Sequence, residues 1–192
     1  VGKISKELEE NLLLACIDMI PLLFEASTNV SYYLYVIWTY CSLSPLNRQN
    51  VYCLYPRRGI FHGLMSVLKT RDSDARYRAV AIFELFSMDP EYIVVLEKRR
   101  YYSKLRDLLY EYRVDERKHL CMMYLNAVRY CDESFITTIG KYSLIRAFKY
   151  LLLNSSDQQV IDVSIEFLYR TTRRLNGDIK KEMTKVGLQS IG

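Results

Sequence analysis

Glycine and proline are scarce in this chain: its 192 residues include 7 Gly and 4 Pro, and no proline follows Pro90. An all-β sandwich or barrel needs many turn residues between its strands, so the scarcity argues against that class and favours long helices. Half of the residues are hydrophobic and 26% are charged. This is the composition of a folded protein with a packed core, not of a disordered segment.

Catalytic and metal-binding residues are also scarce, since the chain has two His and one Trp. No Gly-rich phosphate loop, Gly-x-Ser-x-Gly turn or His-Glu-x-x-His pattern occurs. The acidic pairs Asp115-Glu116 and Asp132-Glu133 fall at predicted helix starts, where carboxylates favour the helix. His119 and Cys121 are the nearest approach to a metal cluster, and further ligands are missing. We therefore predict a protein that is not an enzyme and uses no cofactor or metal.

The five cysteines show no Cys-x-x-Cys spacing, and their odd number suits a reducing compartment better than a disulfide framework. A cytoplasmic or nuclear location is therefore expected. Residues 26–47 carry no charge, but the apolar part, Val30 to Leu43, has only 14 residues. A membrane-spanning helix needs about 20 residues. We predict a buried helix there and no membrane span.

Positive charge is concentrated in the second half of the chain. Residues 1–96 hold 9 basic and 10 acidic side chains, whereas residues 97–192 hold 18 basic and 12 acidic ones, a net charge of +6. Such an excess favours an acidic peptide, a phosphorylated segment or nucleic acid as a partner. A solvated basic face without a ligand is the alternative.

Similar segments recur at intervals of about 43 residues. Asp89-Pro90 with Ile93 is echoed by Asp132-Glu133 with Ile136, and the leucines near residue 105 recur as apolar residues near 148. Each unit is predicted to hold three helices, because apolar residues recur at intervals of three and four. The predicted helices are Val30–Leu43, Arg48–Tyr55, Ile60–Lys69, a longer helix that follows the polar turn Thr70–Asp74 and runs to about Ser87, Glu91–Lys98, Tyr101–Tyr112, Asp115–Cys131, Glu133–Lys141, Leu144–Leu153 and Asp157–Arg174, with less regular helix at Lys3–Ala26 and Gly177–Gly192.

This pattern resembles the armadillo repeat family, most closely in Gly59-Ile60-Phe61-x-x-Leu64-x-x-Val67-Leu68 and in Lys185-Val186-Gly187-Leu188. The resemblance covers about residues 45–192 and implies an all-α, right-handed α-solenoid of three-helix repeats. It departs from the family where Arg100 and Tyr142 replace the glycine between the first and second helices. A HEAT-like or other superhelical domain and a globular bundle are the alternatives. The expected units are about residues 3–44, 45–88, 89–131, 132–175 and part of a fifth, 176–192, in one domain cut from a longer array.

The resemblance also implies a function: a non-catalytic scaffold whose concave groove, lined by third helices, holds an extended or helical segment of another protein. The positive second half suggests an acidic or phosphorylated segment. Importin-type members of the family carry Trp and, four residues later, Asn on successive third helices. Anchored on Pro45 and Pro90 and then on an offset of 43, the corresponding groove positions here are Trp38, Ser42, Phe83, Ser87, Asn126, Tyr130, Tyr169 and Arg173.

Two other modes of action are open. The first is nucleic-acid binding through the basic half of the chain, with interleaved tyrosines stacking on bases. An architectural segment that joins a complex through a flat helical face is the second. The basic residues that would serve nucleic-acid binding are Arg99, Arg100, Lys104, Arg106, Arg170, Arg173 and Arg174.

Overall fold

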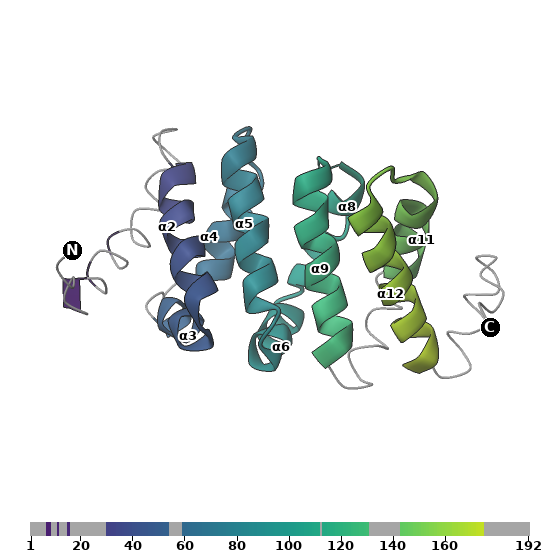
Figure 1. Cartoon of the computed structure of the whole chain (residues 1–192). Helices are drawn as coiled ribbons and strands as arrows, with labels where there is room; N and C mark the ends of the chain where they lie inside the picture. Colours follow the sequence, from purple (N-terminus) through teal and green to yellow (C-terminus); the bar gives the residue numbers. More distant parts are fainter. Residues whose placement is uncertain are drawn as a thin grey trace. The chain divides into compact units, whose positions relative to one another are not determined.

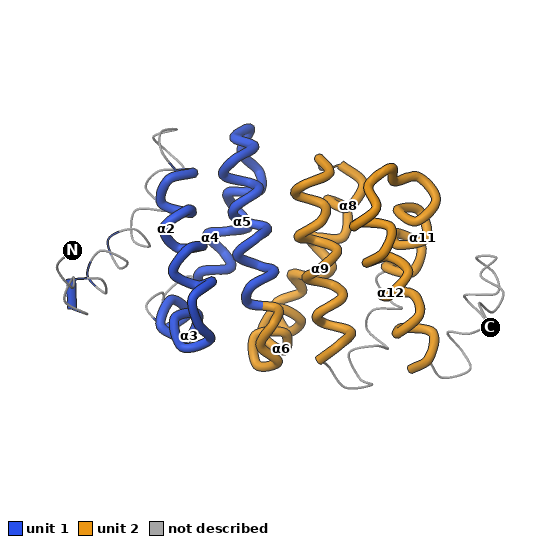
Figure 2. Tube along the Cα trace, viewed as in Figure 1, with its two compact units in different colours: residues 1–86 blue, residues 87–192 orange. Residues whose placement is uncertain are grey.

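The computed structural model describes residues 30–53, 59–111, 113–130 and 143–174, together with residues 7, 8, 11 and 15. Every regular element in these stretches is an α-helix (Figure 1), as predicted. The chain divides into two compact units, residues 1–86 and 87–192 (Figure 2). The helices predicted at 133–141 and 177–192, and most of that at 3–26, lie outside the described residues. The predicted repeat boundaries stay predictions.

In the first unit, the third helices of two successive repeats pack against each other. The helices described there are α2 (Val30–Leu43), α3 (Pro45–Cys53), α4 (Ile60–Val67) and α5 (Ser73–Phe86). The contact between α2 and α5 buries Leu34 and Ile37 of α2, and the predicted core residues of α5 are all buried: Ala79, Ile82, Phe83 and Phe86. The uncharged stretch is therefore a helix with a buried face, as predicted. Among the described residues, no helix combines the length and apolarity that crossing a membrane requires.

The second unit repeats this arrangement. Its described helices are α6 (Pro90–Lys98), α7 (Tyr101–Leu105), α8 (Leu108–Glu111), α9 (Val114–Tyr130), α11 (Leu144–Asn154) and α12 (Gln158–Arg174). The third helix α12 packs on α11 and on α9. The core rings of Phe148 on α11 and Phe167 on α12 stack with centroids 3.8 Å apart. Tyr101, Tyr124 and Phe167 are buried, which confirms that they serve packing.

One predicted helix is interrupted. The segment predicted as a single helix over Tyr101–Tyr112 forms α7 and α8, separated by a turn at Arg106 and Asp107. In that turn the backbone N–H groups of Leu109 and Tyr110 bond to carbonyl oxygens three residues back, at 3.1 Å each. Such bonds tighten a helix to a 3₁₀-type turn without any glycine or proline.

Side chains next to the helix starts supply the missing backbone partners. Asp72 Oδ1 accepts hydrogen bonds from the N–H groups of Asp74 and Ala75, both at 3.0 Å, so Asp72 caps α5. Of the two predicted caps, Asp72 and Ser73, the structure uses the first. Ser44 caps α3 in the same way, because its Oγ accepts a bond from the N–H of Asn47 at 3.1 Å. Each cap satisfies an N–H group that has no partner within its own helix.

In the three repeats whose second helix is described, a residue with positive φ precedes that helix. Gly59 (φ 76°), Arg100 (φ 58°) and Ser143 (φ 54°) directly precede α4, α7 and α11. The glycine substitute in the later repeat is therefore Ser143, not Tyr142 as predicted. The three positions lie 41 and 43 residues apart, so the repeat length varies along the chain.

Because the repeat length varies, the residues of successive third helices correspond at a different offset from the predicted one. Phe83 of α5 packs on Phe61 of the preceding second helix, with ring centroids 5.6 Å apart, and Tyr124 of α9 packs on Tyr102 in the same way at 5.5 Å. Phe83 therefore corresponds to Tyr124, an offset of 41. The predicted pairing of Phe83 with Asn126, at an offset of 43, was wrong by two residues.

Candidate functional site

The third helices α9 and α12 lie side by side (Figure 1) and are joined by ion pairs near both ends. Near the N-terminal ends, Lys118 Nζ of α9 lies 3.0 Å from Asp157 Oδ2, just before α12. The other carboxylate oxygen of Asp157 accepts a bond from the N–H of Val160 at 3.1 Å. The hydrogen bond from Lys118 lowers the pKa of Asp157. Asp157 therefore both caps the start of α12 and links it to α9 through the ion pair with Lys118.

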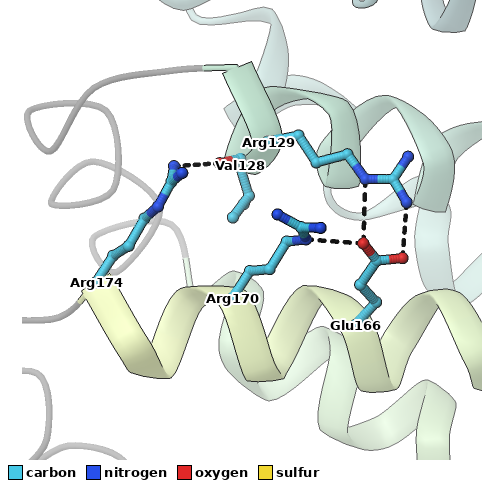
Figure 3. Close-up of polar contacts among 5 residues, drawn as sticks. All are labelled: Val128, Arg129, Glu166, Arg170 and Arg174. Atoms are coloured by element: carbon cyan, nitrogen blue, oxygen red, sulfur yellow. Dashed lines mark hydrogen bonds and ion pairs between the residues drawn. The ribbon is translucent and has the colours of Figure 1, made fainter.

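Towards the C-terminal ends, two arginines converge on one glutamate (Figure 3). Arg129 of α9 donates from Nε to Glu166 Oε1 at 3.2 Å and from Nη2 to Oε2 at 2.7 Å. Arg170, one turn after Glu166 on α12, donates from Nε to Oε1 at 2.7 Å. The hydrogen bond from Arg129, followed by that from Arg170, lowers the pKa of Glu166 below its usual range. The glutamate is therefore ionised at neutral pH.

A further arginine binds a carbonyl oxygen at the C-terminal end of α9. Arg174 Nη1 of α12 donates to the carbonyl oxygen of Val128 at 2.6 Å (Figure 3). Val128 lies in the last turn of α9, where carbonyl oxygens have no partner within the helix. A cation there also complements the helix dipole. Arg174 therefore serves helix packing.

Towards the same ends of α9 and α12 lie exposed tyrosines and an arginine that has no polar partner among the described residues. Tyr130, the last residue of α9, has 51% of its surface exposed and Tyr169 of α12 has 47%. The guanidinium carbon of Arg173 lies 4.7 Å from the centroid of the Tyr169 ring. We call the set Arg129, Tyr130, Glu166, Tyr169, Arg170 and Arg173 the Arg–Tyr face. Three arginines and one glutamate give it a net charge of +2.

The first unit has a comparable arrangement of its own. Arg78 of α5 lies over the ring of Tyr35 on α2 at 4.8 Å, and its Nε donates to Ser31 Oγ at 3.1 Å. Trp38 is tilted against the same tyrosine, with ring centroids 6.1 Å apart. Here too a tyrosine on a third helix is covered by an arginine. Because a neighbouring helix supplies Arg78, this contact also links α2 to α5.

The groove residues predicted from the resemblance fall into two sets. Trp38 is half-buried, and Ser42, Tyr130, Tyr169 and Arg173 are exposed. By contrast, Phe83, Ser87 and Asn126 are buried, so their prediction as ligand-contacting residues is corrected. Phe83 is a core residue because it corresponds to the buried Tyr124 of the next repeat, at an offset of 41. Ser87 and Asn126 bond to each other, since Asn126 Nδ2 donates to Ser87 Oγ at 3.1 Å.

The predicted basic face is not a single set of available cations. Arg106 is paired with Asp107 at 2.7 Å, Arg170 with Glu166, and Arg174 with the Val128 carbonyl. Arg99, Arg100 and Lys104 are exposed near the start of α7, and Lys104 lies over the Tyr101 ring at 5.1 Å. The tyrosines interleaved there, Tyr101 and Tyr102, are buried and cannot stack on bases.

The sequence reasoning missed Glu166, Arg129, Tyr35 and Arg78. The spacing of Glu166 and Arg170, four residues apart on one helix, is a recognisable signal for an ion pair. No sequence spacing identifies Arg129, which comes from the neighbouring helix. Within the described stretches, no three His, Cys, Asp or Glu side chains gather in a way that could hold a metal ion.

No family model and no curated protein matches this chain. The solved structures that it resembles include engineered proteins and designed armadillo repeat proteins. Over 95% of this chain and 74% of the other, it is similar to computationally designed armadillo repeat proteins for modular peptide recognition (TM-score 0.78, 14% identity). A designed armadillo repeat protein in complex with the peptide (KR)4 matches with a TM-score of 0.69 and 15% identity, over 97% of this chain and 84% of the other.

An engineered protein from a structural genomics consortium is similar over 87% of this chain and 71% of its own, with a TM-score of 0.69 and 15% identity. Likeness at these identities concerns the backbone arrangement alone. The chain has the all-α solenoid fold of the armadillo repeat proteins.

Proposed function

We propose that the protein is a non-catalytic scaffold that binds an extended or helical, acidic segment of a partner protein on its third helices. The observation that carries the proposal is Arg173 stacked on Tyr169, an exposed arginine–tyrosine pair on the third helix α12. Tyrosine and arginine are the residue types that most often dominate the energy of protein interfaces. The likeness to designed peptide-binding proteins supports a peptide ligand.

The sign of the ligand's charge follows from the arginines. Together with Arg174, the end of the α9–α12 pair holds four arginines and one glutamate. The (KR)4 peptide bound by one of the designed neighbours carries only positive charge. A peptide of that kind would be repelled here, whereas carboxylate or phosphate groups would be attracted. The concave groove that the resemblance implies stays a prediction.

A second proposal, nucleic-acid binding, has less support. Three of its predicted arginines already have partners within the second unit, and its tyrosines near residue 101 are in the core. Binding of single strands depends on exposed rings next to available cations. No observation on the described residues favours this function over peptide binding.

The test is calorimetric titration with three peptides of equal length: (KR)4, an alternating Glu-Ser peptide, and the same peptide phosphorylated on serine. We expect the two acidic peptides to bind, the phosphorylated one more tightly, and both more weakly at high salt because charges are screened. Binding of (KR)4 alone, or binding that ignores salt, would contradict the proposal. A single-stranded oligonucleotide of the same charge as the phosphopeptide serves as the control for charge alone.

A further inference from the structure

Glu166 occupies the place that a ligand's anionic group would take. Guanidinium groups from two helices converge on its carboxylate, and Arg129 binds both oxygens (Figure 3). The contact is not sealed in the core: the side chains of Arg129, Glu166 and Arg170 are 30%, 34% and 41% exposed. A forked arginine contact of this kind is the usual way in which proteins bind carboxylate and phosphate.

The N–H donors of Arg129 and Arg170 are only partly used in binding Glu166. Each guanidinium has five N–H groups, and within the described part of the chain Arg129 uses two of them and Arg170 one on Glu166. One negative charge faces two positive ones, so the cluster keeps a net charge of +1. An incoming phosphate would meet suitable donors but also the repulsion of the Glu166 carboxylate.

Arg173 is in a different situation, although it lies only three residues after Arg170. Among the described residues it makes no hydrogen bond or ion pair, and its only specific contact is with the Tyr169 ring. The two arginines of the cluster therefore differ from Arg173 in having an internal carboxylate partner. Arg173 is exposed, and among the described residues no carboxylate competes with a ligand for it.

We propose that Arg129 and Arg170 form a carboxylate- or phosphate-binding subsite, and that Glu166 is its internal competitor. The ligand's anionic groups bind Arg173 directly, while Glu166 weakens their binding at the neighbouring pair. This inference concerns the same face as the proposed function and rests on it for the biological ligand. The subsite itself is tested with inorganic phosphate, which requires no peptide.

The first experiment follows the Nε–H signals of Arg129, Arg170 and Arg173 by NMR during titration with inorganic phosphate. In the parent protein we expect the Arg173 signal to respond and the other two to stay nearly unchanged. In Glu166→Gln the signals of Arg129 and Arg170 should respond too, with phosphate binding about tenfold tighter, because a repelling charge becomes a neutral amide. An adventitious, unsaturable response of all arginines alike would overturn the inference.

Asp162→Asn is the matched control. Asp162 lies one turn before Glu166 on α12, is exposed, and accepts its hydrogen bond at 2.7 Å from Gln158, not from an arginine. The variant makes the same change of charge nearby, so a response equal to that of Glu166→Gln would show that net charge alone acts and would refute the subsite. If Glu166→Gln lowers the melting temperature severely, Arg170→Ala in the parent protein gives a second readout. The inference expects Arg170→Ala to leave phosphate binding within about twofold, since Glu166 already holds that arginine.

A second experiment repeats the comparison with the acidic peptide. Glu166→Gln should tighten binding of the peptide about tenfold. Adding Arg170→Ala should remove most of that gain, because the gain depends on the arginine that Glu166 no longer holds. If the peptide binds none of the proteins while phosphate behaves as expected, the proposed function fails and the subsite stands. If the peptide binds but Glu166→Gln and Asp162→Asn act alike, the subsite fails and the proposed function stands.

Discussion

The hydroxyl of Tyr124 donates a hydrogen bond of 2.6 Å to the backbone carbonyl oxygen of Tyr102. Both residues are fully buried, and the bond connects the third helix α9 to the second helix α7 of the same repeat. A buried carbonyl oxygen is costly without a partner. Burial raises the pKa of Tyr124 well above its usual value, which keeps the hydroxyl protonated as a donor.

Tyr124→Phe should lower the free energy of unfolding by about 0.5–1.5 kcal/mol, because it removes a hydrogen bond from the core. Tyr169→Phe, at an exposed position, should change it by less than about 0.5 kcal/mol. Urea denaturation followed by circular dichroism measures both. Equal effects of the two substitutions would show that the Tyr124 bond does not stabilise the repeat.

The three positive-φ positions predict opposite effects of glycine and alanine. Arg100→Gly and Ser143→Gly should each stabilise the protein by up to about 1 kcal/mol, because a side chain in the left-handed region is strained. Gly59→Ala should destabilise it by about 1–3 kcal/mol, since the backbone there, φ 76° and ψ 137°, is disfavoured for any residue with a Cβ. Thermal unfolding compares the three variants. Stabilisation by Gly59→Ala would be incompatible with this backbone geometry.

The third helices could be predicted closely, because long amphipathic stretches define them. The bounds of α2 were predicted as found, and the end of α5 and both bounds of α12 to within a residue. The break between α7 and α8 could not be foreseen, since Arg106 and Asp107 are ordinary helix residues. The left-handed backbone at Ser143 could not be foreseen either. It is determined by the position where α11 begins and not by the type of residue there.

The candidate site was predicted only in part. Of the predicted groove positions, Tyr130, Tyr169 and Arg173 are exposed, and their role in ligand binding stays a prediction. The predicted offset of 43 holds between Arg100 and Ser143, which precede the second helices of the last two repeats. It fails between the second and third, where one residue pair, Phe83 and Tyr124, defines an offset of 41. A shift of two residues rotates a helical position by more than half a turn, which moves a residue from a surface to the core. Contacts such as that of Arg129 with Glu166 depend on the packing of two helices and have no local signal.

Acid should weaken the link between α9 and α12. The pKa values of Glu166 and Asp157 are lowered from the usual 4.5 and 3.8 by their cationic partners. Their folded-state pKa values lie below the unfolded ones, so their contribution to stability is present above about pH 5 and is lost as the pH falls through the folded values. Unfolding free energies between about pH 6 and 3 should therefore decline less steeply in Glu166→Gln than in the parent protein. An unchanged slope would mean that the Glu166 carboxylate contributes nothing.

The cysteines should differ in reactivity. Burial raises the pKa of Cys41 and of Cys121 to about 12, whereas Cys53 is exposed. The thiolate is the reactive form, so the two buried cysteines should be alkylated far more slowly than Cys53 at pH 8. Peptide mapping by mass spectrometry after timed exposure to iodoacetamide separates the sites. Rapid labelling of Cys121 in the folded protein would contradict its place in the core of α9.

The central proposal is that the Arg–Tyr face binds an acidic segment, and one pair of double variants tests it directly by calorimetry with the acidic peptide. Tyr130→Ala with Arg173→Ala removes one exposed ring and the one arginine of the face without a polar partner. Arg99→Ala with Tyr150→Ala removes the same kinds of group elsewhere in the second unit, both exposed. We expect the first pair to weaken binding by about 2–4 kcal/mol with an unchanged helical signal, and the control pair to weaken it by less than about 0.5 kcal/mol. Unchanged binding by the first pair, with loss in the control, would place the ligand on the opposite basic residues around Arg99 and Arg100 and refute the proposal.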